Sequence, residues 1–163
     1  MGRGKMPVTT AVRELRANKV EFTDHPYEYE EKGGTAASAR ELGVPEHAVV
    51  KTLVMEDEDK RPLVVLMHGD LKVSTRELAR IIGVKAVSPC SPETANRHSG
   101  YIVGGTSPFG TRRKMPVYME ESILELPKIY INGGRRGYLV GIAPQDVVRV
   151  LAPRLVKVGI SEG

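Results

Sequence analysis

The chain has 163 residues and a single cysteine, Cys90, so it is long enough to bury a core without cross-links and cannot form a disulfide framework or a cysteine-rich metal site. Its net charge of +4 is a mild indication of a polyanionic partner. The longest apolar runs, such as LVVLM at 63–67, are too short to span a bilayer, and the first ten residues lack the apolar segment of a signal peptide. These two features predict a cytoplasmic protein without a membrane partner.

Apolar spacing and capping residues predict the elements of the first half of the chain. A helix, two short strands and a second helix are expected at 7–18, 20–22, 26–30 and 35–43. Thr35 is the predicted N-cap of the second helix, and Gly43 is its predicted end. VVKTLVME at 49–56 and PLVVLMH at 62–68 flank an acidic turn, so we expect them to form a hairpin at the centre of a sheet.

The second half of the chain mixes helices and strands in no regular order. Helices are expected at 75–82, 91–98 and 144–151, and strands at 101–103, 116–119, 128–132, 137–142 and 155–158. Because the elements do not alternate as βαβ units, a doubly wound sheet is not expected. The sequence predicts the α+β class, with a mixed, curved, barrel-like β-sheet surrounded by helices, in a single domain spanning 1–163.

The stretch GYIVGGTSPFG at 100–110 carries strand-forming residues that run directly into glycines. Four of the seven positions from Gly104 to Gly110 are glycine or proline, more than a plain turn needs. Such a loop indicates backbone that approaches another group closely.

Basic residues gather in three clusters: Arg3 with Lys5, Arg112-Arg113-Lys114 after the glycine loop, and Arg135-Arg136 within GGRRG. Solvated hairpin tips would explain any one of them. Because two clusters lie beside glycines, we interpret them as candidates for phosphate contact. With two Phe and no Trp in the chain, aromatic stacking along a nucleic-acid strand is not expected.

Lys51 is the one charged residue inside the apolar segment VVKTLV. Strand alternation places it on the face of Val49 and Leu53, where it either extends outward to solvent or is held for a function, and both interpretations remain open.

The four histidines show no pattern that is typical of a metal site or a catalytic triad. His25, His47, His68 and His98 are far apart in the sequence without metal-ligand spacing, and no Ser-His-Asp order is present. Each is expected to be an ordinary surface or boundary residue, so no metal site is predicted.

Three motifs together carry a family resemblance. KTL at 51–53, GYIVGGTSPFG at 100–110 and IYINGGRRGYLVGI at 129–142, in this order and at these distances, resemble the YbaK family of aminoacyl-tRNA deacylases. The segment AVRELRANKVEFTDHPYEYE at 11–30 is similar to that family's opening helix and strand. The free-standing branch that clears cysteine from tRNA for proline, Cys-tRNA(Pro), is the most similar branch, and the fold it implies agrees with the fold predicted above.

The resemblance implies roles for individual residues. Lys51 would supply a fixed positive charge near the terminal phosphate or the ester, while Gly104, Gly105 and Ser107 would line the aminoacyl end. The implied substrate-binding residues are Tyr27, Thr106 and Pro108, and the implied RNA-binding residues are Arg112, Arg113, Lys114, Arg135 and Arg136. For Tyr27, a half-buried core position is an equally good interpretation. The implied partners are aminoacyl-tRNA and prolyl-tRNA synthetase, with no DNA, no cofactor and no metal.

The resemblance also implies a mechanism in which the thiol of the substrate cysteine attacks its own ester. In that case Cys90 should be dispensable. Two alternatives remain: an Ala-tRNA(Pro) deacylase that activates water, because alanine has no thiol, and a noncatalytic module that binds tRNA or a synthetase.

Overall fold

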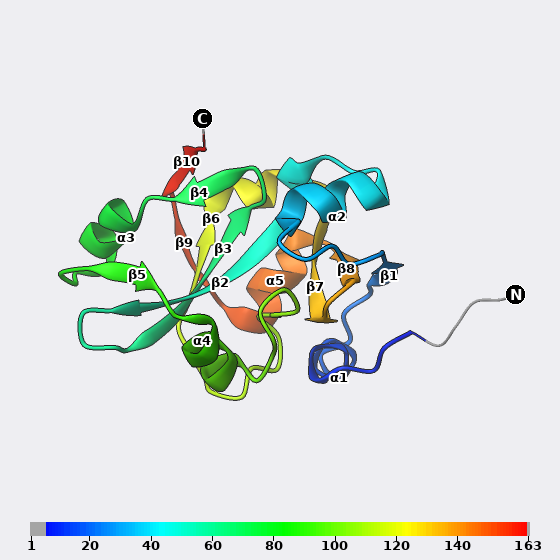
Figure 1. Cartoon of the computed structure of the whole chain (residues 1–163), viewed down its shortest axis with the longest axis horizontal. Coiled ribbons are helices and arrows are strands. Elements are labelled where there is room, and N and C mark those ends of the chain that lie inside the picture. Colours follow the sequence, from blue (N-terminus) through cyan, green and yellow to red (C-terminus); the bar gives the residue numbers. More distant parts are fainter. Residues whose placement is uncertain (1–5, 163) are drawn as a thin grey trace, which may run out of the picture.

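A computed structural model of the chain describes residues 6–162, in which helices lie around one large sheet (Figure 1). Arg3 and Lys5, the first predicted basic cluster, lie outside the described residues. The helices are α1 (Thr10–Ala17), α2 (Gly34–Leu42), α3 (Thr75–Ile82), α4 (Pro92–Ser99) and α5 (Pro144–Leu151), with short 3-10 helices η1 (Glu46–Ala48) and η2 (Glu121–Glu125). The strands are β1 (Thr23–Pro26), β2 (Val49–Asp57), β3 (Pro62–His68), β4 (Leu71–Val73), β5 (Val87–Pro89), β6 (Val117–Glu120), β7 (Ile129–Arg135), β8 (Tyr138–Ile142), β9 (Arg154–Val156) and β10 (Gly159–Ser161).

The main sheet is mixed and has eight strands. Its spatial order is β1-β8-β7-β2-β3-β6-β9, with β5 added beside β2, while β10 and β4 form a separate antiparallel pair. The pairs β2–β7, β3–β6 and β6–β9 are parallel, and the other pairs of the main sheet are antiparallel. The predicted α+β class and mixed sheet are therefore confirmed, and the hairpin β2–β3 lies at the centre as expected.

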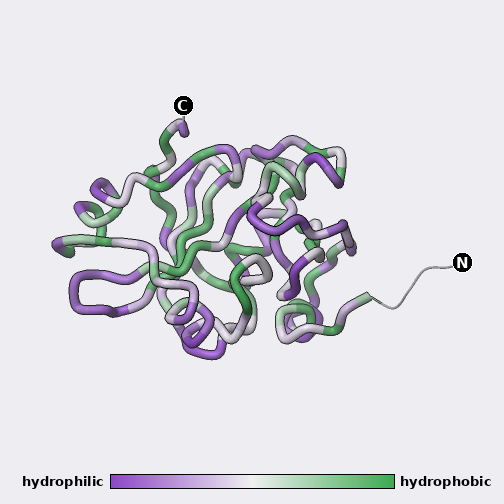
Figure 2. The backbone as a smooth tube through the Cα atoms, in the orientation of Figure 1, coloured by the Kyte–Doolittle hydropathy of each residue, from purple (hydrophilic) through white to green (hydrophobic). Residues whose placement is uncertain are grey.

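The central strand β3 is buried on both faces, which explains its unbroken apolar run. Val64 and Leu66 belong to one core cluster, whereas Leu63, Val65 and Met67 belong to a second cluster on the other side. Figure 2 shows this contrast: the central strands are hydrophobic, and the turn between β2 and β3 is hydrophilic.

Local capping signals set most helix ends. The hydroxyl of Ser91 accepts a hydrogen bond from the backbone N–H of Thr94 at the start of α4, and Gly43 and Gly100 end α2 and α4 in the left-handed conformation. The prediction for Thr35 was wrong, because α2 begins at Gly34 without a side-chain cap. Thr35 instead donates to side-chain and backbone oxygens outside its helix.

The structure corrects the strand predictions around the glycine loop and near the N-terminus. Residues 101–103 form no strand, because Gly100 ends α4 at a φ of 82° and the N–H of Val103 is taken by the side chain of Asn96 at 3.0 Å. A single strand at 23–26 replaces the two strands that were expected at 20–22 and 26–30. None of the helices in residues 6–162 is long and apolar enough to cross a membrane.

Candidate functional site

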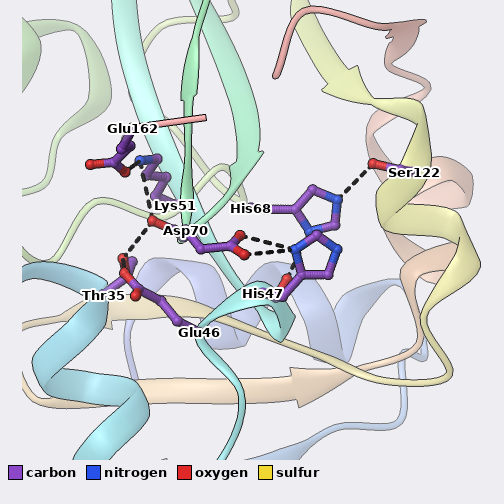
Figure 3. A network of polar contacts seen from close by, with 9 residues as sticks. Thr35, Glu46, His47, Lys51, His68, Asp70, Ser122 and Glu162 are labelled. Atoms are coloured by element: carbon purple, nitrogen blue, oxygen red, sulfur yellow. Dashed lines mark hydrogen bonds and ion pairs between the residues drawn. The ribbon is translucent and has the colours of Figure 1, made fainter. Parts of the chain in front are cut away.

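Lys51 projects from β2 as a largely buried cation. Its side chain is 22% exposed, and its Nζ lies 3.4 Å from the carbonyl oxygen of Gly69 and 3.5 Å from the carboxylate of Glu162 (Figure 3). Glu162 reaches this position because β10, just before it in the chain, pairs with β4. The ammonium group is thus held by two oxygens from segments far apart in the sequence, and it does not extend freely into solvent.

The carbonyl of Gly69 is the centre of a small polar network. It also accepts a hydrogen bond of 3.1 Å from the hydroxyl of Thr35, which lies 2.7 Å from a carboxylate oxygen of Glu46. A Cβ on Gly69 would meet the Thr35 hydroxyl at 2.7 Å and the backbone oxygen of Glu46 at 2.9 Å. Only glycine therefore allows the chain to pass this closely to α2 and η1.

A second network adjoins the first, since Asp70 directly follows Gly69. The rings of His47 and His68 stack with centroids 3.7 Å apart, and Nδ1 of His47 lies 2.9 Å from the carboxylate of Asp70. His68 is fully buried, with Nδ1 2.7 Å from the backbone oxygen of His47 and Nε2 2.7 Å from the hydroxyl of Ser122 (Figure 3). The expectation of an ordinary surface or boundary residue was wrong for His68, because β3 buries its ring against His47 of η1. It was also wrong for His98, which is buried in α4.

The donor atoms of His47, His68 and Asp70 lie within 4.8 Å of one another, a spacing that would permit metal binding. However, both ring nitrogens of His68 already have oxygen partners. A metal ion would have to displace one of them, so the arrangement is explained by hydrogen bonding.

The parallel pairing of β2 with β7 joins the strand of Lys51 to the glycine loop. Val49 lies opposite Tyr130 and Val50 opposite Ile131, so the next residues along the two strands are Lys51 and Asn132. The side-chain amide of Asn132 donates to the backbone oxygen of Gly104 at 3.0 Å. The strand pairing and this hydrogen bond therefore bring the segments near positions 51, 104 and 132 next to one another.

The glycines of the loop make room for the β7–β8 turn. A Cβ on Gly105 would lie 2.8 Å from the backbone nitrogen of Arg136, and one on Gly104 would lie 2.7 Å from the hydroxyl of Tyr29. The close approach that the sequence indicated is thus, first of all, an approach to the protein's own chain. Arg136 fastens the loop further, because its Nε donates to the backbone oxygen of Val103 at 3.0 Å and its guanidinium lies over the ring of Tyr29.

The other predicted loop residues differ in exposure. Ser107 is fully buried, and its hydroxyl accepts a hydrogen bond of 3.1 Å from the backbone N–H of Phe109, which fixes the bend of the loop. Pro108 is buried and Thr106 is half-buried, whereas Gly104 is exposed. Of these residues, Gly104 and Thr106 present atoms to solvent at the site.

Tyr27 is half-buried and packs against the small cluster of Ala39, Val49 and Leu139, close to the Lys51 face. Burial raises the pKa of its phenol, and its backbone N–H donates to the backbone oxygen of Gly137 at 2.9 Å. Sequence reasoning missed Tyr29 and Asn132. Both lie within segments that carry the family resemblance, 11–30 and 129–142, and that position was the signal available for them.

Cys90 lies away from Lys51. It packs against the core cluster that contains Val50 and Val54, on the opposite face of β2 from Lys51. Burial and the neighbouring Glu56 raise the pKa of the Cys90 thiol to about 11. A thiol in this state is a poor nucleophile at neutral pH.

The predicted RNA-binding residues divide into two groups. Arg112, Arg113 and Lys114 are exposed and, within residues 6–162, form no ion pair with a carboxylate. Arg135 and Arg136 are also exposed, but Arg136 is engaged in holding the loop.

Comparison with known protein families identifies the class to which this fold belongs. The chain belongs to the aminoacyl-tRNA editing domain family, whose model matches residues 30–150. The family resemblance inferred from the motifs is confirmed.

Individual relatives agree with this assignment. The chain is 26% identical to the Enterococcus faecalis protein named "Putative Cys-tRNA(Pro)/Cys-tRNA(Cys) deacylase EbsC", over 94% of each chain. It is 30% identical to proline–tRNA ligase of Thermodesulfovibrio yellowstonii over 63% of this chain, which corresponds to 18% of that enzyme. The crystal structure titled "putative trans-editing enzyme for prolyl tRNA synthetase" has a similar fold, with a TM-score of 0.80 at 20% identity, covering 97% of this chain and 100% of that one.

Proposed function

We propose that this editing domain is a trans-acting deacylase that clears Cys-tRNA(Pro), with the thiol of the substrate cysteine as the nucleophile. The observation that carries the proposal is the composition of the Lys51 face: a held cation next to a glycine loop, with the only cysteine of the chain on the opposite face of β2. The name of the Enterococcus faecalis relative supports the same substrate class.

The proposed reaction begins when the substrate thiolate attacks the carbonyl carbon of its own ester. A carbon–sulfur bond forms, the bond from that carbon to the ribose oxygen breaks, and the ribose oxygen takes up the proton that the thiol lost. The products are tRNA with a free terminal hydroxyl and a four-membered cysteine thiolactone, which water opens to cysteine.

Lys51 would act by charge and not as a base. Negative charge grows on the carbonyl oxygen as the sulfur attacks, and a preorganised ammonium group stabilises that charge. Its contacts with Gly69 and Glu162 fix the position of Nζ before substrate arrives. Such positioning is effective because little reorganisation is needed during the reaction.

A second candidate, removal of alanine by activated water, is favoured by one feature. Nδ1 of His47 lies 2.9 Å from Asp70, and the side chain of His47 is 45% exposed. A histidine oriented by a carboxylate can serve as a general base for water. Asp70 directly follows Gly69, whose carbonyl holds Lys51, so this pair would act on the same substrate.

The experiment that separates these functions uses tRNA(Pro) charged with cysteine, serine or alanine. Serine has nearly the shape of cysteine but lacks a thiol, whose pKa is about 8.5. The thiol mechanism therefore predicts that cysteine is cleared more than about a hundredfold faster than serine. Equal rates on cysteine and serine would contradict it. Loss of alanine clearance in His47→Ala would support activated water, and no clearance of any substrate would support a noncatalytic binding module.

A further inference from the structure

Two hollows flank helix α4, and both are lined by Arg97. The first, of about 370 Å³, lies between α4 and the start of the glycine loop and is also lined by Ile102 and Arg112. The second, of about 670 Å³, lies on the other side of the helix and includes Lys60 and Arg113. In Figure 1, α4 lies at the lower edge of the molecule, beside the loop that leads towards β6. We call the surface formed by Arg97, Ile102, Arg112 and Arg113 the α4 groove.

The arginines of the α4 groove have no acidic partner. Within residues 6–162, none of the three forms an ion pair, whereas Arg61, Arg80 and Arg149 elsewhere on the surface each contact a carboxylate. Two acidic residues do line the hollows. Glu56, in the second hollow, lies 3.4 Å from Lys60, and Glu93, in the first, lies one helical turn before Arg97. The arginines therefore outnumber the free carboxylates, and the groove attracts anions.

Hydrogen bonds fix the backbone of two of these arginines beside α4. The N–H of Arg112 donates to the backbone oxygen of Ser99 at 2.9 Å, and the N–H of Arg113 donates to that of His98 at 3.0 Å. These bonds fasten the segment to the last turn of α4, and they let one arginine line each hollow. The fold thus fixes the backbone positions from which these two arginines reach the hollows.

His98 contacts the side chain of Arg113 in the α4 groove. It is 8% exposed, and its Nδ1 lies 3.5 Å from a guanidinium nitrogen of Arg113. Burial lowers the pKa of His98, and the charges of Arg113 and Arg97 lower it further. A neutral imidazole can accept a hydrogen bond from Arg113 and orient it without adding repulsion.

Apolar surface completes the first hollow. Ile102 is 62% exposed and Val103 is 42% exposed, two of the most exposed large apolar side chains in residues 6–162. The N–H of Val103 is bonded to Asn96 of α4, which holds this apolar edge beside the groove. An apolar edge next to unpaired guanidinium groups suits a nucleotide, whose base is flat and apolar on its faces and whose phosphate is anionic.

We propose that the α4 groove binds the single-stranded end of an RNA, with a base against Ile102 and phosphates on Arg97, Arg112 and Arg113. This inference rests on the proposed function, because it assigns to the groove the part of the tRNA next to the esterified ribose. Ile102 lies two residues before Gly104, whose backbone oxygen accepts a hydrogen bond from Asn132 on the strand next to that of Lys51. The chain of the RNA would therefore pass from the arginines along the glycine loop towards the ester.

Binding of uncharged RNA tests the proposal without any need for turnover. The probe is a short 5′-fluorescent single-stranded RNA ending in CCA, and its affinity is measured by anisotropy over a range of salt concentrations. Two variants are measured: the single variant Arg97→Ala and the double variant Arg112→Ala/Arg113→Ala. We expect each to weaken binding about tenfold or more. Each should also lower the slope of log affinity against log salt concentration by about 0.7 for each phosphate that is no longer neutralised. The matched control is Arg76→Ala, an exposed arginine of α3 that also has no ion pair and should bind like the wild type.

Two further comparisons complete the test. Ile102→Ser should weaken binding without changing the salt slope, because it removes an apolar side chain and no charge. The proposal would be overturned if both arginine variants kept the wild-type affinity and salt slope. It would also be overturned if Arg76→Ala lost as much affinity as they do, because RNA binding would then depend only on the overall charge. The binding measurement uses uncharged RNA and needs no deacylation. If the protein cleared no charged tRNA, the deacylase proposal would fail, but the measured affinities would still test whether the α4 groove binds RNA.

Discussion

Lys51 and the arginines of the α4 groove are cations on one molecule, and they differ in what surrounds them. Lys51 is 22% exposed and has two oxygen partners, whereas the groove arginines are exposed and lack carboxylate partners. A cation held in place acts at short range on a charge that develops at one atom. Free cations act over longer distances on a polyanion and lose strength as salt is added. The Lys51 site is therefore suited to catalysis, and the α4 groove is suited to binding a polyanion.

The largest expected effect is that of Lys51→Ala. Loss of the held charge should lower kcat for Cys-tRNA(Pro) by about a hundredfold to a thousandfold, in line with removal of one electrostatic contact to a developing oxyanion. RNA affinity should stay within about twofold of wild type, because the groove is intact. Single-turnover deacylation and RNA anisotropy measure the two quantities. An unfolded variant, judged by circular dichroism, would show instead that Lys51 is structural.

Gly105→Ala should lower both stability and activity, because the glycine loop packs against the β7–β8 turn. The new Cβ would lie 2.8 Å from the backbone nitrogen of Arg136, so the loop or the turn must shift, at a cost of about 1–3 kcal/mol in the free energy of unfolding. Activity should fall about tenfold or more, since small displacements of positioning groups are costly. Urea unfolding and single-turnover deacylation measure the two effects.

The control for that variant is Gly43→Ala. Gly43 has a φ of 69° and open space around its Cβ position, so the substitution strains the backbone without a clash. It should lower stability by about 1 kcal/mol and leave deacylation unchanged. If both variants lose the same stability and the same activity, the loop is not specifically linked to the site.

Glu162→Gln should have a smaller effect on the Lys51 site. The pair is 3.5 Å apart and the glutamate side chain is 53% exposed, so its contribution to stability is at most about 1 kcal/mol. Removing the carboxylate leaves Lys51 with more net positive charge for the substrate, and we expect a decrease in KM of about twofold to fivefold. Lys72→Gln, an exposed substitution on the neighbouring β4, serves as the control. An increase in KM would mean that the loss of positioning of Lys51 outweighs the gain in net positive charge.

The smallest effect is expected for Cys90→Ala, which should keep wild-type kcat and KM. Because burial and Glu56 raise the pKa of Cys90 to about 11, the thiol stays protonated near pH 7. Alkylation by iodoacetamide should be slow at neutral pH and accelerate as the pH rises towards the pKa, in step with the thiolate fraction. Mass spectrometry of the alkylated protein measures the rate of this reaction at each pH. Loss of deacylation activity in Cys90→Ala would contradict the substrate-thiol mechanism.

Part of the fold was predictable because its signals are local. Helix α3 and the hairpin β2–β3 follow from apolar spacing, and Gly43 and Gly83 mark helix ends wherever the rest of the chain lies. The strand expected at 101–103 shows the limit of such signals. Tyr101 and Ile102 favour a strand locally, but the end of α4 and the bond from Val103 to Asn96 leave no partner strand for them.

By itself, the sequence determined the class of fold, the family and the two features that stand out along the chain: a charge inside an apolar strand and a glycine-rich loop. Each is visible because it breaks a local pattern. Only the tertiary structure decided which residues meet. The β2–β7 pairing joins positions about 80 residues apart in sequence, and with it Asn132 reaches Gly104. The stack of His47 on His68 and the sharing of Arg97 between two hollows likewise depend on strand register and helix packing, which no short window of sequence encodes.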